Sequence, residues 1–321
     1  MAIRNYSIAT AFMGALALAW TPVNAADYPN KSINIIVPFN PGGGADTSQR
    51  TFNKFAGPIV GQSLVVINKP GAGGTRGWAE LVRKKADGYT MAIVTPPFNI
   101  IPALARPKQT GYTLDQFTNI CIYAVVPDVL LVRSDSPWKT LGDLVKDPKS
   151  RTGKLKVANT GKLGADLMTT LLIEDATGIK MTKVPFTGGS KSFKAILSGT
   201  VEVMVGSAKF AAKGKGRLRT LGVSSAKRSP SLKDVPTFKE QSYNVVSERF
   251  RAFAGPKGLP KNIVDYWGNV CKKVTENAGF RAAMKKIKQP PAFRGPAEAQ
   301  ALIEGMAKRM KALVDKYDLK K

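Results

Sequence analysis

A short apolar strand that leads directly into a glycine-rich loop and then a helix constrains this chain more than any other segment. Residues 33–37 (INIIV) predict a buried strand, residues 38–46 form a loop with three consecutive glycines, and a helix is predicted from about 47 to 55. Glycines let backbone N–H groups approach a bound molecule closely, and a helix N-terminus carries partial positive charge. Together these features predict an anion-binding site.

The first 25 residues have the pattern of a cleaved export signal. Arg4 is the only charged residue among them, residues 8–20 are uncharged and mostly apolar, and Val23-Asn24-Ala25 supplies small residues before a cut between Ala25 and Ala26. The apolar stretch is short for a membrane span, which takes roughly 20 residues. We therefore expect a soluble periplasmic protein, and an uncleaved N-terminal anchor is the alternative.

Basic residues far outnumber acidic ones in the 321-residue chain. Lys plus Arg is 49 and Asp plus Glu is 22, which gives a formal net charge of +27. This balance favours an anionic partner. Aromatic residues are not interleaved with the basic patches as a nucleic-acid platform requires, so we expect no nucleic acid. A small carboxylate is the preferred partner, and a basic protein that binds anionic surfaces is the alternative.

The chain contains no histidine, which limits the chemistry it can perform. Ser-His-Asp and Cys-His catalysis are excluded, and the commonest transition-metal ligand is missing. No paired carboxylates lie on one predicted element, so we expect no enzyme activity, no catalytic residue, no metal and no cofactor. The two cysteines, Cys121 and Cys271, are far apart in sequence. A disulfide and a pair of buried thiols are equally compatible with this spacing.

Strand signals alternate with helix signals along most of the chain, which predicts an α/β fold with parallel sheets. A second strand–loop–helix unit covers residues 154–176, and a third begins at 183. Two apolar stretches, 120–132 and 249–256, are long enough to cross between lobes. We therefore predict a first lobe of residues 26–126 plus 251–321 and a second lobe of residues 127–250. The ligand cleft is expected between them, lined by helix N-termini from both lobes.

Several motifs, in this order and spacing, resemble those of the Bug family (TctC-like), the extracytoplasmic solute receptors of tripartite tricarboxylate transporters. They are Val37-Pro38-Phe39, Gly42-Gly43-Gly44-Ala45-Asp46, Asn68-Lys69-Pro70-Gly71-Ala72-Gly73-Gly74, Asp87-Gly88-Tyr89-Thr90 and Val184-Pro185-Phe186-Thr187-Gly188-Gly189. The resemblance covers essentially the whole mature chain. It implies a type II periplasmic binding protein fold, a monomer that captures a small organic carboxylate, and large and small transmembrane subunits as partners.

The resemblance also implies a ligand site made mainly of backbone amides and hydroxyls on three loops. Carried onto this chain, the site residues are Phe39, Gly43, Gly44 and Asp46 on the first loop, Asn159, Thr160, Gly161, Gly164 and Asp166 on the second, and Thr187 and Gly188 on the third. Asp46 is expected to cap the helix more than to touch the ligand. Lys162 is expected either to pair with a ligand carboxylate or to remain solvated. Arg251 either grips a carboxylate or ties the lobes together.

Two positions depart from the family pattern. Asp166 stands where many relatives have a histidine, and Gly206-Ser207 stands where many have an aspartate that faces a ligand amine or a water. Ser207 is therefore included among the site residues, and the missing aspartate fits a ligand without an amine. A tricarboxylate such as citrate is favoured, followed by an aliphatic or aromatic dicarboxylate. A metal–citrate complex remains open as the ligand.

Overall fold

The structure is a computed structural model that describes residues 28–320, so the predicted export signal lies outside the described residues. The strands are β1 (Ile33–Val37), β2 (Leu64–Asn68), β3 (Thr90–Val94), β4 (Phe117–Arg133), β5 (Leu155–Thr160), β6 (Met181–Phe186), β7 (Val203–Ser207), β8 (Leu218–Val223), β9 (Glu248–Pro256) and β10 (Pro291–Arg294). The helices are α1 (Gly44–Val60), α2 (Thr75–Leu81), α3 (Ile100–Ala105), α4 (Pro107–Thr110), α5 (Leu141–Lys146), α6 (Pro148–Arg151), α7 (Ala165–Thr177), α8 (Gly189–Leu197), α9 (Ala208–Lys213), α10 (Lys261–Glu276), α11 (Ala278–Lys286) and α12 (Pro296–Lys316), with short 3₁₀ turns η2 (Ala72–Gly74) and η3 (Leu114–Gln116).

Two sheet regions share the long strand β4, in the order β2-β1-β3-β9-β4-β7-β5-β6, with β8 and β10 also paired to β4. The β1–β2, β1–β3, β5–β6 and β5–β7 pairs are parallel. The pairs that involve β4 or β9 are antiparallel. The carboxyl ends of parallel neighbours lie at one edge, so the loops after β1, β2 and β3 gather together, as do those after β5, β6 and β7.

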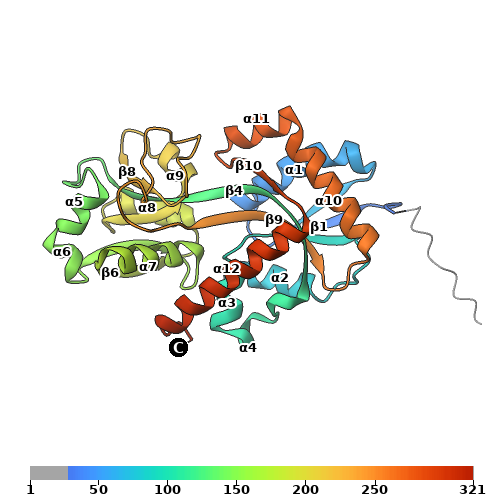
Figure 1. Ribbon diagram of the computed structural model, residues 1–321, viewed down its shortest axis with the longest axis horizontal. Coiled ribbons are helices and arrows are strands. Elements are labelled where there is room, and N and C mark those ends of the chain that lie inside the picture. The colour runs from blue at the N-terminus through green and yellow to red at the C-terminus, as the bar shows by residue number, and fades with distance from the viewer. Residues whose placement is uncertain (1–27, 321) are drawn as a thin grey trace, which may run out of the picture.

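Strands β4 and β9 run side by side between the two ends of the elongated molecule (Figure 1). They correspond to the two predicted crossings. Pro127 does not interrupt β4, which continues through it and pairs with β7 and β8 beyond it. The arrangement has two lobes, and the exact boundaries proposed for them remain a prediction.

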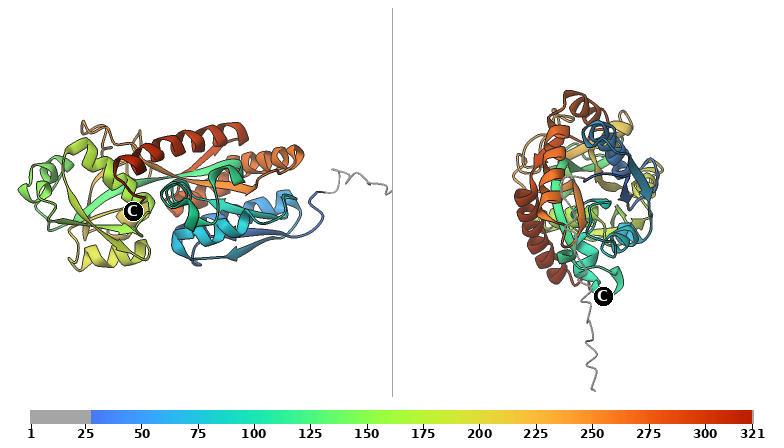
Figure 2. Two further views of the ribbon diagram at one scale, coloured as in Figure 1. Left: turned by 90° about the horizontal axis from the view of Figure 1, so that it is seen from below. Right: turned by 90° about the vertical axis from the view of Figure 1, so that its right-hand side faces the viewer.

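Each sheet region is covered on both faces. On β1, Ile33 and Ile35 pack toward α1 and α10, whereas Ile36 packs toward α2 and α12, as the period of two in a strand requires. On β4, Leu130 and Leu131 alternate in the same way between the α5–α7 side and the α8–α9 side. Figure 2 shows helices above and below the strands in the view from below.

The last helix, α12, lies diagonally across the middle of the molecule and reaches the second lobe at its C-terminal end (Figure 1). Met306, Met310 and Val314 belong to the same hydrophobic cluster as Leu167 and Leu171 of α7. The Tyr317 hydroxyl donates to the Leu171 carbonyl at 3.3 Å. The first and second lobes are therefore packed together through α7 and α12 as well as through the crossing strands.

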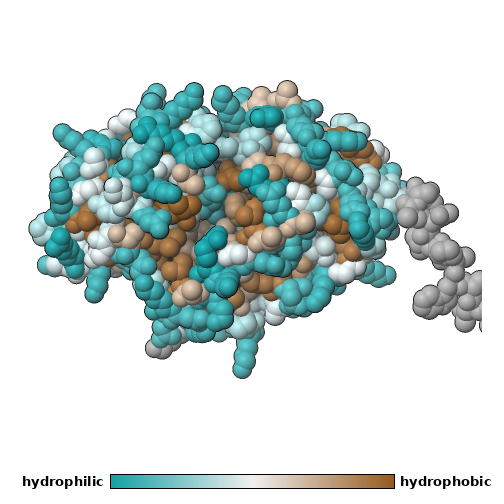
Figure 3. Space-filling view, viewed as in Figure 1, coloured by the Kyte–Doolittle hydropathy of each residue, from teal (hydrophilic) through white to brown (hydrophobic). Residues whose placement is uncertain are grey.

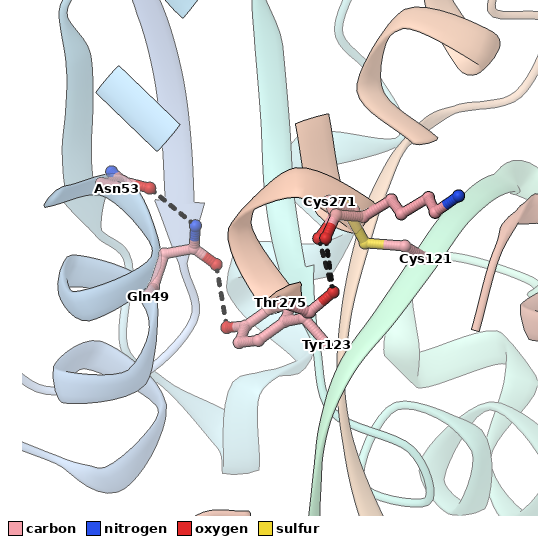
Figure 4. Close-up of a disulfide and its surroundings, with 7 residues drawn as sticks. Gln49, Asn53, Cys121, Tyr123, Cys271 and Thr275 are labelled. Atoms are coloured by element: carbon pink, nitrogen blue, oxygen red, sulfur yellow. Dashed lines mark hydrogen bonds between the residues drawn. A yellow bond between two sulfur atoms is a disulfide. The ribbon is translucent and has the colours of Figure 1, made fainter. Parts of the chain in front are cut away.

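A disulfide joins Cys121 of β4 to Cys271 of α10, across 150 positions of sequence (Figure 4). Both cysteines are fully buried in the cluster beneath α1 and α10. The sequence left a pair of thiols open, and the structure selects the disulfide. No helix within residues 28–320 has the length and apolar character to cross a bilayer.

Candidate functional site

The first glycine loop ends in a helix that begins three residues earlier than the sequence predicts. Helix α1 starts at Gly44 with Gly43 as its N-cap, and the first intrahelical bond runs from the Thr47 N–H to the Gly43 carbonyl at 2.9 Å. The N–H groups of residues 44–46 therefore have no helical acceptor. They form the positive end of α1 and lie directly after the loop.

Asp46 stabilises the first loop from inside the helix instead of serving as the N-cap. Its carboxylate accepts from the Gly42 N–H at 2.9 Å, from Asn68 at 2.9 Å and from Arg50 at 3.0 Å. Partial burial raises the pKa of Asp46, but these hydrogen bonds outweigh it and hold the pKa below its ordinary value. The expected capping role of Asp46 is therefore wrong: Gly43 is the N-cap, and Asp46 lies one turn further into the helix, where its carboxylate holds the loop.

The second loop repeats this arrangement in the other lobe. Gly164 is the N-cap of α7, and an added Cβ there would lie 2.0 Å from the Thr160 carbonyl oxygen, so only glycine fits. The Thr160 N–H donates to the Asp166 carboxylate, just as Gly42 donates to Asp46. Asp166 is completely buried, and this burial together with the charge of Asp128 raises its pKa to about 6, against the opposing effect of Arg249.

Several predicted amides already have acceptors inside the protein. The Gly43 N–H donates to the Asn40 carbonyl at 3.2 Å, and the N–H groups of Gly161 and Gly188 both donate to the Phe186 carbonyl at 2.8 Å. With Thr160, these groups shape their loops and are not free donors in this conformation. Gly44 keeps an N–H that lies before the first intrahelical bond.

The two loops come together along one face of β9. Arg249 and Arg251 are two residues apart on this strand, so their side chains share a face and their Cα atoms are about 7 Å apart. The Arg251 guanidinium lies 3.5 Å from the Cβ position of Gly44, at the start of α1. Arg249 forms an ion pair with Asp128 of β4, which also accepts from Thr169 of α7 at 2.7 Å. The N-terminal ends of α1 and α7 therefore flank the same arginine-bearing strand.

The sequence interpretation did not single out Asp128 and Arg249. Asp128 is completely buried and Arg249 is 7% exposed. Burial lowers the pKa of Arg249, but Asp128 and Asp166 outweigh it and keep the pKa above its ordinary value. The sequence did contain a signal for this pair. Asp128 and Arg249 are charged residues in the two otherwise apolar crossing strands, and a buried charge needs a partner of opposite charge.

The remaining predicted residues lie around this centre. Phe39 contacts Trp78 and Phe98 edge to face, with ring centroids 5.8 and 6.1 Å apart, and Arg249 lies over the Phe98 ring at 5.2 Å. Asn159 is buried and donates to Thr170 at 3.1 Å, which places its amide under the second loop. Ser207 is half-buried at the N-cap of α9, beside Asp128 in the β4–β7 register.

Two predicted residues remain at the surface. Thr187 and Lys162 are exposed, and no side-chain hydrogen bond or ion pair to either was found within the part of the chain that the structure describes. They lie on the second-lobe loops but outside the group that packs along β9. Their predicted contacts with a ligand therefore depend on the ligand itself or on a change in loop position.

Two surface cavities lie away from the arginine-bearing face of β9. One, of about 470 Å³, borders the outer side of α1 and is lined by Gly42, Asp46, Arg50 and Ala283 among others. The other lies at the amino ends of β1 and β3, next to Lys31 and Lys84. Neither joins residues of both lobes, so the glycine loops and β9 define the site better than these cavities. Figure 3 shows hydrophobic side chains reaching the surface in the middle of the molecule, between its two ends.

The chain is similar to proteins of one known family. The model of the "Tripartite tricarboxylate transporter family receptor" matches residues 49–319. A Cupriavidus necator protein, named "UPF0065 protein in gbd 5'region", is 29% identical over 311 residues and covers 96% of this chain and 94% of its own.

Among solved structures, the periplasmic binding protein BugD has a TM-score of 0.79 at 26% identity, covering 91% of this chain and 99% of its own. MatC from Rhodopseudomonas palustris with bound malate has a TM-score of 0.79 at 24% identity, covering 89% and 100%. R. palustris Rpa4515 with adipate has the same TM-score and identity, covering 90% and 98%.

These matches confirm the predicted family and the two-lobed α/β binding-protein fold. The family model spans most of the chain, and the relatives align with it nearly end to end. The family consists of solute-binding receptors and not of enzymes, in agreement with the prediction. The protein therefore belongs to the receptor family of the tripartite tricarboxylate transporters, the TctC or Bug family of periplasmic solute-binding proteins.

Proposed function

We propose that this protein captures a small organic carboxylate in the periplasm and delivers it to a tripartite tricarboxylate transporter. The observation that carries the proposal is the meeting of two glycine-capped helix N-termini at the arginine-bearing face of β9. Helix N-termini and arginine side chains both stabilise carboxylates. Here the helix N-termini belong to α1 and α7, and the arginines belong to β9.

The ligand is proposed to be a carboxylate without an amino group. Ser207 ends β7, at the place where the family resemblance implies an acidic partner for a ligand amine in many relatives. The fold neighbours MatC and Rpa4515 were solved with malate and with adipate, which are both dicarboxylates without an amino group. A tricarboxylate such as citrate is the first candidate because the chain carries a large excess of positive charge.

Export and partners complete the proposal. The N-terminal 25 residues are proposed to be a cleaved signal, and the Cys121–Cys271 disulfide fits an oxidising compartment such as the periplasm. On binding, the lobes are proposed to close around β4 and β9 as hinge strands, in the manner of other binding proteins. The closed form is then presented to the large and small transmembrane subunits.

The first test is a thermal-shift screen of the mature protein against citrate, malate, adipate and an aromatic dicarboxylate at fixed ionic strength. A ligand that binds the native state raises the melting temperature in a saturable way. We expect saturable stabilisation by at least one compound. Absence of a shift with every carboxylate, together with salt-sensitive retention on anionic vesicles, would instead support the surface-binding alternative.

A pair of glycine variants then tests the site itself. In Gly43→Val, the new side chain approaches the Asn40 carbonyl, which lies 3.1 Å from the Cβ position, and deforms the first loop. In Gly57→Ala, which lies within α1, the added methyl group meets nothing within 4 Å. We expect the first variant to lose carboxylate binding and the second to keep it. Equal affinities would refute the assignment of the first loop.

A further inference from the structure

Gln289, a buried residue between α11 and β10, connects the first glycine loop to the crossing strand β9. Its side-chain amide donates to the Gly44 carbonyl at 2.9 Å, across 245 positions of sequence. Its side-chain oxygen accepts from Arg251 Nε at 2.8 Å. Gln289 is only 4% exposed and Arg251 only 7%. One side chain therefore determines where the Arg251 guanidinium lies relative to the start of α1.

This arrangement places like charges together without a protein carboxylate to balance them. The Arg251 guanidinium lies next to the positive end of α1, 3.5 Å from the Cβ position of Gly44. Within residues 28–320, no ion pair joins an acidic side chain to Arg251, and Gln289 makes its single side-chain hydrogen bond. Asp128 of the neighbouring strand β4, whose charge acts on Arg251, is paired with Arg249.

The electrostatic environment agrees with this geometry. Burial, with a smaller contribution from the charge of Arg249, lowers the pKa of Arg251 to about 10, although Tyr123 and Asp128 act in the opposite direction. Burial and the charges of Lys213 and Arg251 also lower the pKa of Lys209, the second residue of α9. A buried cation without a partner is costly, and an anion at this position would remove that cost.

Building on the proposed function, we propose that Gln289 is a positioning residue that holds Arg251 against the α1 N-terminus. In this position, the Nη1 and Nη2 groups of Arg251 and the first backbone amides of α1 bind one ligand carboxylate together. Arg251 supplies two nitrogens that Gln289 leaves free, and the fork of a guanidinium matches a carboxylate. Because Gln289 is neutral, it orients Arg251 without competing for its charge. A glutamate at this position would keep the hydrogen bond from Arg251 Nε, but it could not donate to the Gly44 carbonyl and would neutralise Arg251.

This difference gives a direct test by calorimetric titration of citrate, malate and adipate. Gln289→Glu supplies a carboxylate to Arg251 and is expected to weaken binding at least tenfold. Its urea midpoint is expected to be no lower than that of Gln289→Met. Gln289→Met removes both hydrogen bonds and is expected to weaken binding less, because Arg251 keeps its charge. Gln109→Glu, an exposed site on α4, is the matched control for the change in net charge and should bind as the wild type does.

The outcomes separate this proposal from the proposed function. If the wild type binds neither these three carboxylates nor the aromatic dicarboxylate of the thermal-shift screen, both proposals are refuted. If the wild type binds but Gln289→Glu has the same affinity, only the role of Gln289 is refuted. A purely structural role would instead make affinity follow stability, with Gln289→Met the weaker binder of the two. Should Gln289→Met fail to fold, the comparison of Gln289→Glu with Gln109→Glu still decides the question.

Discussion

Asp166 gives the most quantitative prediction, because its carboxyl is fully buried at the start of α7. Burial raises its pKa from the ordinary 3.8 to about 6, while Arg249 and the Thr160 N–H oppose the rise only in part. The folded state therefore binds this proton more tightly than the unfolded state. Stability from the protonated carboxyl is fully present below pH 3.8 and is lost as the pH rises through 6.

The magnitude follows from the two pKa values. Their difference corresponds to about 3 kcal/mol of unfolding free energy, at about 1.4 kcal/mol per pH unit. At pH 8 essentially all of this is lost, whereas at pH 4.5 only about 1 kcal/mol is lost. Asp166→Asn keeps an oxygen that can accept from the Thr160 N–H but cannot ionise. We therefore expect it to gain about 2 kcal/mol relative to the wild type between pH 4.5 and pH 8.

Urea unfolding of the wild type and Asp166→Asn at both pH values measures this gain. The quantity of interest is how the difference in unfolding free energy between the two proteins changes from pH 4.5 to pH 8. Any constant effect of the substitution cancels, since only the change with pH is compared. Asp234→Asn, at an exposed loop position, is the matched control. Its difference in unfolding free energy from the wild type should change by less than about 0.5 kcal/mol between the two pH values. If the wild type and Asp166→Asn keep the same separation at both pH values, the burial argument for Asp166 is wrong.

Three further predictions concern stability and the second loop. Asp128→Asn should cost about 3–5 kcal/mol in urea unfolding because it leaves Arg249 buried without its partner, and an added Arg249→Met should recover much of the loss. A loss below about 1 kcal/mol would contradict the ion pair. Cys121→Ser should lower stability by about 2–5 kcal/mol, since the disulfide closes a loop of 150 residues, and a reductant should destabilise the wild type but not the variant. Gly164→Ala should weaken carboxylate binding, because its Cβ would overlap the Thr160 carbonyl at 2.0 Å, and unchanged affinity would show that the loop does not contact the ligand.

Patterns that act over a few residues were predictable. The second strand–loop–helix unit, predicted over residues 154–176, is formed by β5 (Leu155–Thr160) and α7 (Ala165–Thr177). The glycines at 43 and 164 do precede helices, because close backbone approach and helix capping are local requirements. The start of α1 was predicted three residues late. Its glycines read as a loop, yet Gly44 takes helical geometry once Asp46 holds the Gly42 N–H.

The surroundings of the site were less predictable. Arg251 was expected either at the ligand or between the lobes, and the structure places it beside Gly44 with Gln289 as its partner. Gln289 was not anticipated, because nothing in its local sequence distinguishes it from a surface glutamine. The same holds for Arg249, whose partner Asp128 lies on a different strand.

The sequence alone determined the alternation of strands and helices, the glycine loops at strand ends, the absence of histidine chemistry and the family. The first three depend on periodicity, turn geometry or composition, which are properties of short segments or of the chain as a whole. The family depends on the order and spacing of motifs that resemble those of its members. Only the tertiary structure decided the disulfide, the Asp128–Arg249 pair and the contacts of Gln289 with Arg251 and Gly44. These join residues on separate elements, as far as 245 positions apart, and depend on the register of β4 against β9 and on how the helices pack around them.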